Sequence, residues 1–306
     1  MRSVSVIVPT YNCAARLEQA LASIAAQTYP HRELEVVVVD DGSSDDTAER
    51  VAAFAAREAI ATRYVYQNNA GPAAARNHGM RIARGDALAF LDADDRWEPA
   101  KLERQLPLLG GRVALVYCDN SYVDAGGRPL SDYVRRVQLQ RGDILLPLFC
   151  DFFLLTSAVV LDRKAVRTVG GFDEKLPVGE DYEFFLRFAQ RYDADCVEDK
   201  LLVRCVRPDS LSRRDYALDA RVDLATLAAF ARRHPEFARR NRAAVQRRLA
   251  SYRYDFGYRL LADQRRREAI PELLHSLRAS PSIAATRTLA RALLPPRAAR
   301  AMRASG

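Results

Sequence analysis

The sequence predicts an α/β fold: a mainly parallel, Rossmann-like sheet flanked by helices, followed by an all-helical C-terminal region. In the first hundred residues, short β-branched apolar runs alternate with stretches whose apolar residues recur at helical spacing. From about Tyr216 onward every segment has a helical pattern, and Arg is present without Lys. We therefore expect one domain over 1–215 and a basic helical domain over 216–306.

Charge composition changes at the same place. Residues 216–306 contain 19 Arg against 7 Asp and Glu, a net charge of +12. Because the whole chain carries +8, residues 1–215 carry −4. An acidic body is therefore followed by a basic region, which can attract an anionic partner.

Cysteine usage and hydropathy bear on the compartment. The five cysteines are scattered without CxxC spacing, which favours neither a disulfide framework nor a zinc site and fits a reducing cytoplasm. The N-terminal segment has no apolar run of signal-peptide length. The most apolar stretch, 143–163, is interrupted by Pro147 and Asp151, so we expect buried core there and no spanning helix. We expect a cytoplasmic protein that can lie peripherally at the inner face of the membrane.

The first half alternates strands and helices at a spacing that requires right-handed crossovers, and hence mainly parallel strands. The expected strands lie within 4–12, 34–46, 62–71 and 86–95, and the helices between them within 14–28, 46–58 and 71–85. Ligands of such sheets bind beyond the carboxyl ends of the strands. Here those ends are polar: Pro9–Asn12, Asp40–Ser44, Asn68–Gly71 and Asp92–Asp95.

After Pro99 the pattern loosens. A strand, a turn at Gly126 and Gly127 and a return strand are expected over 113–130, and a strand with a short helix over 156–174. An amphipathic helix follows over 179–192. In the C-terminal region we expect helices separated near four prolines, Pro235, Pro271, Pro281 and Pro295.

The stretch "FLDADDRW" ends an apolar run with three carboxylates, Asp92, Asp94 and Asp95. Like charges at this spacing repel, and partial burial makes each harder to ionise. A bound cation compensates such a cluster, and oxygen-only ligands suit Mg²⁺ or Mn²⁺ better than zinc. The alternative is an acidic turn that caps the next helix, a role that suits Asp95 best.

Six motifs occur together in one order: "VSVIVPTYN", "VVVVDDGSSDDT", "NAGPAAARNHG", "FLDADDRWEP", "GGFDE" and "GEDYEFFLR". Each is weak alone, but the set resembles a family 2 glycosyltransferase of the A-type, nucleotide-sugar fold. The resemblance covers roughly residues 3–212. It implies an enzyme that uses a nucleotide-sugar donor.

The resemblance implies roles on the nucleotide side. Asp41 matches the carboxylate that accepts a hydrogen bond from the nucleobase imide, where a charge-assisted bond is strong. Pro9, Thr10 and Tyr11 match the loop against the base, with the Tyr11 ring able to stack; the alternative for Tyr11 is a half-buried loop aromatic. Arg76 matches an arginine that offsets negative charge on the nucleotide, and its alternative is a surface salt bridge.

The resemblance also implies roles near the reaction centre. Asp92 matches the residue facing the ribose and the metal, Ala93 belongs to the same donor site, and Asp94 matches the direct ligand of Mn²⁺ or Mg²⁺. Asp181 matches the general base of an inverting single displacement, which needs one carboxylate to take the acceptor's proton. Glu180 can position the sugar or acceptor, or only favour the helix start.

One departure from the family concerns "VRCVRPDSLSRR". Related sequences often carry a His near the metal in this segment, whereas this chain has Arg207, which stays protonated and cannot ligate a metal. Arg207 then contacts the diphosphate, or the metal has fewer protein ligands. The four histidines show no ligand spacing, and His78 is the weak exception because it lies in the "ARNHG" motif.

The sequence therefore predicts an inverting, metal-dependent transferase that moves a sugar, with UDP favoured as its nucleotide, to a hydroxyl of a glycan or lipid-linked acceptor. A non-catalytic nucleotide-sugar-binding or scaffold subunit of a polysaccharide-assembly complex is the alternative. A dehalogenase-like phosphatase would carry its DxD on an early strand followed by Thr, and a dehydrogenase would need GxGxxG; neither pattern is present.

The basic helices allow two interpretations. Their arginines form a solvated helix face, or they attract an anionic membrane surface where lipid-linked acceptors reside. No aromatic-interleaved platform accompanies them, so we expect no nucleic-acid partner.

Overall fold

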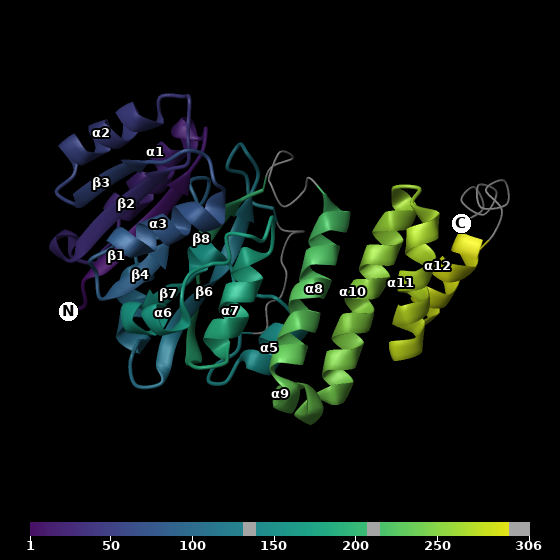
Figure 1. The fold of residues 1–306 in the computed structure, drawn as a ribbon. Helices are drawn as coiled ribbons and strands as arrows, with labels where there is room; N and C mark the ends of the chain where they lie inside the picture. Colours follow the sequence, from purple (N-terminus) through teal and green to yellow (C-terminus); the bar gives the residue numbers. More distant parts are fainter. Residues whose placement is uncertain (131–138, 207–214, 294–306) are drawn as a thin grey trace. The chain divides into compact units, whose positions relative to one another are not determined.

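The computed structural model describes residues 1–130, 139–206 and 215–293. The chain forms two compact units, Met1–Pro208 and Asp209–Gly306 (Figure 1). Arg207 lies outside the described residues, so both expectations for this segment, a contact of Arg207 with the diphosphate or a metal with fewer protein ligands, stay predictions.

The first unit is built on a mixed sheet, whose described strands follow the order β3-β2-β1-β4-β7-β6-β8-β5. Strands β3, β2, β1 and β4 are parallel to one another. Strand β7 is antiparallel to β4 and β6, while β8 is parallel to β6 and antiparallel to β5. The strands are β1 Val4–Thr10, β2 Leu34–Asp40, β3 Ala61–Tyr66, β4 Ala87–Phe90, β5 Arg96–Trp97, β6 Val113–Val123, β7 Val160–Asp162 and β8 Asp193–Cys205.

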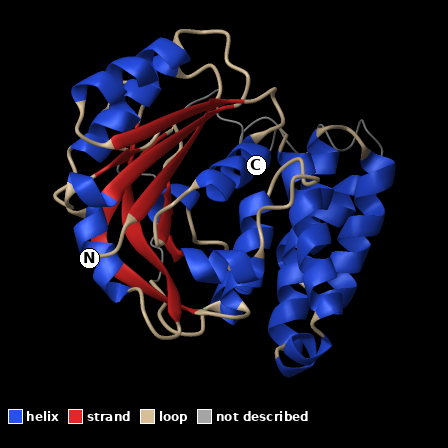
Figure 2. Cartoon of the chain, turned by 60° about the vertical axis from the view of Figure 1, so that its left-hand side comes forward, coloured by secondary structure: helices blue, strands red, loops and turns tan. Residues whose placement is uncertain are grey.

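Helices cover both faces of this sheet (Figure 2). Because the central strands are covered on both sides, β1, β2 and β4 are almost continuously apolar and buried. The helices of this unit are α1 Ala14–Ala25, α2 Thr47–Arg57, α3 Pro72–Ile82, α4 Lys101–Gln105, α5 Leu145–Cys150, α6 Arg163–Val169 and α7 Glu180–Ala189.

The strand register aligns the polar strand ends that the sequence predicts. Thr10 pairs with Asp40, and Asp40 with Tyr66, so β1, β2 and β3 end together. Ile7 pairs with Phe90, which places the acidic turn after β4 at the same edge. The parallel half of the sheet is thus confirmed.

The other half of the sheet differs from the sequence prediction. Strands β5 and β8 were not predicted, because β5 has two residues and β8 is interrupted by three exposed residues. The return strand expected after Gly127 is wrong: a single bridge joins Val123 to Pro129. A tight turn replaces the strand there.

The second unit is helical in its described part. Asp215 caps the first helix by accepting from the backbone N–H groups of Ala217 and Leu218. The break predicted near Pro271 is wrong, because α11 continues through it; Leu273 packs against Gly257 of α10 and holds the helix in place. The helices are α8 Tyr216–Arg233, α9 Pro235–Arg240, α10 Arg242–Ala262, α11 Arg266–Ala279 and α12 Ile283–Leu293. None of the described helices has the length and apolar character to cross a membrane.

The side chain of Lys101, at the start of α4, is fully buried. Its Nζ lies 4.2 Å from the centroid of the Trp97 ring and has no hydrogen-bond partner among the described residues. Burial lowers the pKa of Lys101 to about 8. The folded chain therefore pays a desolvation cost at neutral pH that the aromatic ring offsets only in part.

Replacing Lys101 with Met should raise the free energy of unfolding at pH 7 by about 2 kcal/mol, because the cost of burying the charge disappears. Between pH 8 and about 10.5 the unfolded chain holds a proton that the folded chain has lost, so wild-type stability rises with pH there. Urea unfolding of both proteins should show that the difference in free energy of unfolding between the variant and the wild type is smaller at pH 10 than at pH 7. A difference that is independent of pH would contradict the buried charge.

Candidate active site

Asp41, directly after β2, lies buried at the aligned strand ends. Its Oδ1 accepts hydrogen bonds from Gln67 Nε2 at 2.7 Å and from the backbone N–H of Ala70 at 2.9 Å. Its Oδ2 accepts from the N–H of Gly71 at 2.8 Å. The predicted nucleobase acceptor thus also ties the end of β2 to the loop that leads into α3.

Gln67 is a site residue that the sequence analysis missed. Its Oε1 lies 2.9 Å from Nδ1 of His78 in α3, while its amide nitrogen holds Asp41. Because an amide oxygen only accepts, the His78 Nδ1 carries the proton in this arrangement. His78 therefore orients Gln67 through Nδ1. The position of Gln67 directly after β3 is the sequence signal that could have identified it.

Pro9 and Thr10 are the last residues of β1, paired with Val39 and Asp40 of β2, and Tyr11 begins the loop that follows. Thr10 is buried, and its hydroxyl has no hydrogen-bond partner among the described residues. Asn12 has a positive φ of 48° and accepts at Oδ1 from the N–H of Ser44, which fixes the loop to its neighbour. Tyr11 is 53% exposed, which is compatible both with a ring that stacks on a base and with the alternative of a half-buried loop aromatic. The backbone is held while the ring stays available.

Arg76 of α3 joins two of the predicted site segments. Its guanidinium is buried and pairs with Asp92 Oδ1 at 2.9 Å and with Glu180 Oε1 at 2.7 Å. Burial alone would lower the pKa of Arg76, but the charges of Asp92 and Glu180 raise it above its usual range. The alternative of a surface salt bridge is therefore wrong. Arg76 instead forms a buried bridge between the turn after β4 and the start of α7.

The acidic turn after β4 is folded tightly. The Asp92 N–H donates to Ser157 Oγ at 3.0 Å, and the Asp95 N–H donates to the Asp92 carbonyl at 2.9 Å. Burial, followed by the charges of Asp92 and Asp94, raises the pKa of Asp95 to about 7. The expected capping role of Asp95 is not seen, because α4 begins at Lys101 with Ala100 as its N-cap.

The same turn has a second cation nearby that the sequence analysis missed. Burial would lower the pKa of Arg204 in β8, but Asp95, Asp92 and Asp94 contribute to raising it instead. The described residues contain no group of three or more acidic, His or Cys side chains arranged around a metal position. Asp92 and Asp94 are the carboxylates of this turn that are not fully buried, and they remain the candidate ligands.

Helix α7 presents the last predicted site residues. Gly179, with φ of 71°, precedes Glu180, and Asp181 follows in the first turn. Glu180 is buried against Arg76, whereas Asp181 is half-buried. The positive end of the helix dipole favours a carboxylate at this position.

Asn77 positions the segment that leads to α7. Its Oδ1 accepts from the N–H of Phe172, and its Nδ2 donates to the Phe172 carbonyl at 2.9 Å and to Glu174 Oε1 at 2.7 Å. A Cβ on Gly171 would lie 2.4 Å from Asn77 Oδ1, so glycine is required there. This contact accounts for the second glycine of the "GGF" motif, whereas the first, Gly170, has a φ of 91° that favours glycine.

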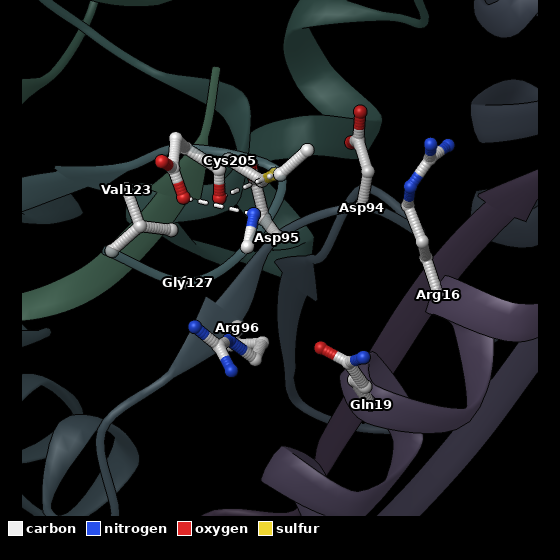
Figure 3. Close-up of a pocket in the computed structure, with 11 residues that line it drawn as sticks. Arg16, Gln19, Asp94, Asp95, Arg96, Val123, Gly127 and Cys205 are labelled. Atoms are coloured by element: carbon white, nitrogen blue, oxygen red, sulfur yellow. Dashed lines mark hydrogen bonds between the residues drawn. The ribbon is translucent and has the colours of Figure 1, made fainter. Parts of the chain in front are cut away.

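Two pockets flank this site within the first unit. One of about 180 Å³ is lined by residues that include Gly71, Lys175 and Glu180. The other, of about 220 Å³, is lined by residues that include Asp94 and Arg96 (Figure 3). The structure therefore brings Asp41, Arg76, Asp92, Asp94 and Glu180 to one edge of the sheet, with a hollow on either side.

The sequence of this unit matches the model of a known protein family. The family model for glycosyl transferase family 2 matches residues 5–161, just over half of the chain. The chain therefore belongs to glycosyl transferase family 2.

Curated relatives are also described as glycosyltransferases. An uncharacterized glycosyltransferase of Haemophilus influenzae is 30% identical over 187 residues, which cover 61% of this chain and 71% of the relative. One of Rickettsia conorii is 30% identical over 191 residues, covering 60% of this chain and 31% of the relative. The chain spans less than two thirds of the length of the Rickettsia relatives it matches.

Solved structures show the same fold. A mannosyltransferase from Pyrobaculum calidifontis, in complex with GDP-Man and Mn²⁺, has a TM-score of 0.63 at 24% identity, over 99% of this chain and 84% of that one. S. aureus TarS 1-349, in complex with UDP-GlcNAc, has a TM-score of 0.62 at 20% identity, over 99% and 92%. The A-type nucleotide-sugar fold predicted from the sequence, with its helical C-terminal region, is confirmed.

Replacing Arg76 with Met should lower the free energy of unfolding by about 3 kcal/mol, because Glu180 and Asp92 lose their shared counter-charge in a buried place. The control Arg104→Met removes an exposed pair with Asp199 and should change stability by less than about 1 kcal/mol. Urea unfolding followed by circular dichroism measures both. If both variants lost the same free energy of unfolding, the buried bridge would contribute no more to stability than an exposed ion pair.

Proposed function

We propose that this protein is an inverting, divalent-metal-dependent glycosyltransferase that moves a sugar from a UDP-sugar to a hydroxyl of a glycan or lipid-linked acceptor. The observation that carries the proposal is the Arg76 bridge. It connects the turn with the candidate metal ligands Asp92 and Asp94 to the helix with the candidate base Asp181. Donor and base would then be held in one rigid frame, as a displacement reaction requires.

The nucleoside would bind at the ends of β1 and β2. Asp41 Oδ2 accepts a hydrogen bond from the N–H of Gly71, and a carboxylate oxygen has room for a second, which suits the imide N–H of uracil. Tyr11 offers an exposed ring for stacking, and the Thr10 hydroxyl lies beside it. The solved relatives that hold UDP-GlcNAc and GDP-Man support a nucleotide at this place, and they make GDP the alternative to test.

The donor set of the acidic turn fits a divalent cation. Asp92 and Asp94 would hold it, since Mg²⁺ and Mn²⁺ sites commonly use one or two carboxylates and complete their shell with phosphate oxygens and water. When bound, such an ion supplies Lewis-acid stabilisation of a leaving diphosphate. Mn²⁺ is present in the mannosyltransferase structure, which supports the same chemistry here. Ala93 is buried between the two carboxylates and keeps the turn narrow.

Asp181 would accept the proton of the attacking hydroxyl. Its neighbour Glu180 is committed to Arg76 at 2.7 Å and cannot compete for that proton without breaking the pair. A single displacement with one base inverts the configuration at the anomeric carbon. Glu180 is thus a positioning residue, which holds the first turn of α7 against the donor side.

The alternative class, a nucleotide-sugar-binding subunit without turnover, shares every binding contact described above. Release of nucleoside diphosphate over time distinguishes the two classes, because a binding subunit shows affinity alone.

Replacing Asp181 with Asn should keep donor affinity and lower nucleotide release from UDP- or GDP-hexose by about 10²- to 10⁴-fold, since the proton acceptor is removed. Wild-type turnover should require added Mn²⁺ or Mg²⁺ and stop in excess chelator. The exposed neighbour substitution Asp173→Asn is the control and should keep the wild-type rate. Loss of donor affinity in Asp181→Asn would place Asp181 in the binding site instead, and full activity in chelator would remove the metal from the proposal.

We also propose that the helices of 216–306 bring the enzyme to an anionic membrane surface. In the described part of this unit, Arg253 pairs with Glu272 and Arg265 pairs with Glu268. Arg239, Arg240 and Arg247 are exposed and form no ion pair with an acid of the described residues. These three arginines share the corner formed by α9 and the start of α10.

Arg248, beside this corner, has a different role. Its guanidinium stacks on the Tyr252 ring at 4.4 Å and donates to the Tyr252 hydroxyl at 3.0 Å. A charge reversal there would disturb packing, so the test leaves Arg248 unchanged.

Changing Arg239, Arg240 and Arg247 together to Glu should weaken binding to phosphatidylserine vesicles at least about 100-fold at low salt, because each basic residue near such a surface contributes about 1 kcal/mol. The matched control changes three exposed arginines of α11 and α12, Arg267, Arg278 and Arg287, to Glu. Vesicle co-sedimentation measures both. Wild-type protein that ignores anionic vesicles would reject the membrane partner.

A further inference from the structure

The pocket beside Asp94 has walls from three rigidly held elements. Arg16 and Gln19 are three residues apart on α1 and so share one side of that helix. Arg96 lies in β5, which pairs with β8. The third wall is the turn 124–128, where the Asp124 carboxylate accepts from the N–H groups of Gly126 and Arg128 at 2.8 and 2.9 Å. Figure 3 shows Arg16 and Gln19 projecting from α1 at one side of the pocket, and it labels Asp94, Asp95 and Arg96 among the other lining residues.

The polar side chains that line this pocket include both hydrogen-bond donors and hydrogen-bond acceptors. Arg16 and Arg96 are donors, Asp94 and Asp124 are acceptors, and Gln19 is both. Within the described residues, the side chains of Arg96 and Gln19 make no hydrogen bond or ion pair, and Arg16 has one long contact of 3.9 Å to the Cys13 sulfur. The wall therefore presents unused donors next to carboxylates.

A neutral, hydroxyl-rich ligand fits this wall better than an anion does. A vicinal diol can donate to a carboxylate and accept from a guanidinium at once, whereas a phosphate would face three carboxylates among the lining residues, Asp94, Asp95 and Asp124. The volume of about 220 Å³ corresponds to about seven waters. This is room for one small ring, smaller than the usual drug-sized pocket.

We propose that this pocket is a saccharide subsite that binds one sugar ring, with Arg96 and Gln19 determining which ring is accepted. The proposal rests on the glycosyltransferase function above. Because Asp94 belongs both to the pocket and to the candidate metal turn, a ring bound here lies next to the diphosphate position. The ring can belong to the donor or to the acceptor, and the chemistry of recognition is the same for both.

The first test measures binding of methyl hexopyranosides by saturation-transfer NMR, with and without UDP. Arg96→Met keeps the side-chain length and removes the donors, and Gln19→Ala changes an exposed residue that the fold does not need. Each should weaken binding about two- to tenfold, the effect of one or two lost hydrogen bonds. Arg81→Met, at an exposed arginine of α3, is the matched control and should bind like the wild type.

The second test identifies the source of the ring. If it belongs to the donor, Arg96→Met and Gln19→Ala should raise KM for the slow hydrolysis of a UDP-hexose in the absence of acceptor, while their affinity for UDP alone stays unchanged. If it belongs to the acceptor, KM for hydrolysis stays unchanged while the affinity for methyl hexopyranosides falls as in the first test. Either result supports the subsite.

Two results would overturn it. In the first, Arg96→Met and Gln19→Ala have the same glycoside affinity and the same KM for hydrolysis as the control Arg81→Met. The other is stabilisation by inorganic phosphate that disappears in Arg96→Met, without any glycoside binding in the wild type, which would make the pocket an anion site. A wild-type protein that binds glycosides but neither UDP nor GDP would reject the proposed function and leave the subsite standing.

Discussion

The buried guanidinium of Arg76 is the interaction on which the site depends. Separately, Asp92 follows β4 and Glu180 begins α7, and these segments are far apart in the chain. One planar fork holds both carboxylates, at 2.9 and 2.7 Å. Because Arg presents fixed donors and stays charged, a Lys at this position could not satisfy both partners in the same geometry. The two halves of the site are thus locked together before any ligand arrives.

Around this bridge, helix α3 acts as a common support. Asn77 holds the segment before α7, Arg76 binds Glu180 in the first turn of α7, and His78 orients Gln67 against Asp41. Three consecutive side chains of α3 therefore contact three different segments. This is possible because neighbouring residues on a helix point about 100° apart, so each faces a different neighbour.

Sequence patterns predicted the part of the fold whose signals are local. Alternating apolar runs predicted β1 to β4 and the helices between them, and the aligned strand ends brought Asp41, Asp92 and Asp94 to one edge as expected. Arg204 and Ser157 could not be found in this way, since their partners lie on other elements and no spacing records the contact. Gln67 was missed although it directly follows β3, because its contact with Asp41 joins two different strand ends. The short β5 was missed for a different reason, because a strand of two residues shows no periodicity in the sequence.

The turn 124–128 differs from the rest of the site in being closed mainly on itself. The Asp124 N–H donates to the Arg128 carbonyl, the Gly127 N–H donates to the Asp124 carbonyl, and the Asp124 side chain completes the loop. Its shape is therefore encoded by five neighbouring residues, with Gly127 at a φ of 80°. A segment of this kind is suited to transplantation: a loop of the same length from another member of the family could be grafted between Val123 and Pro129 while the buried frame beneath it stays as it is.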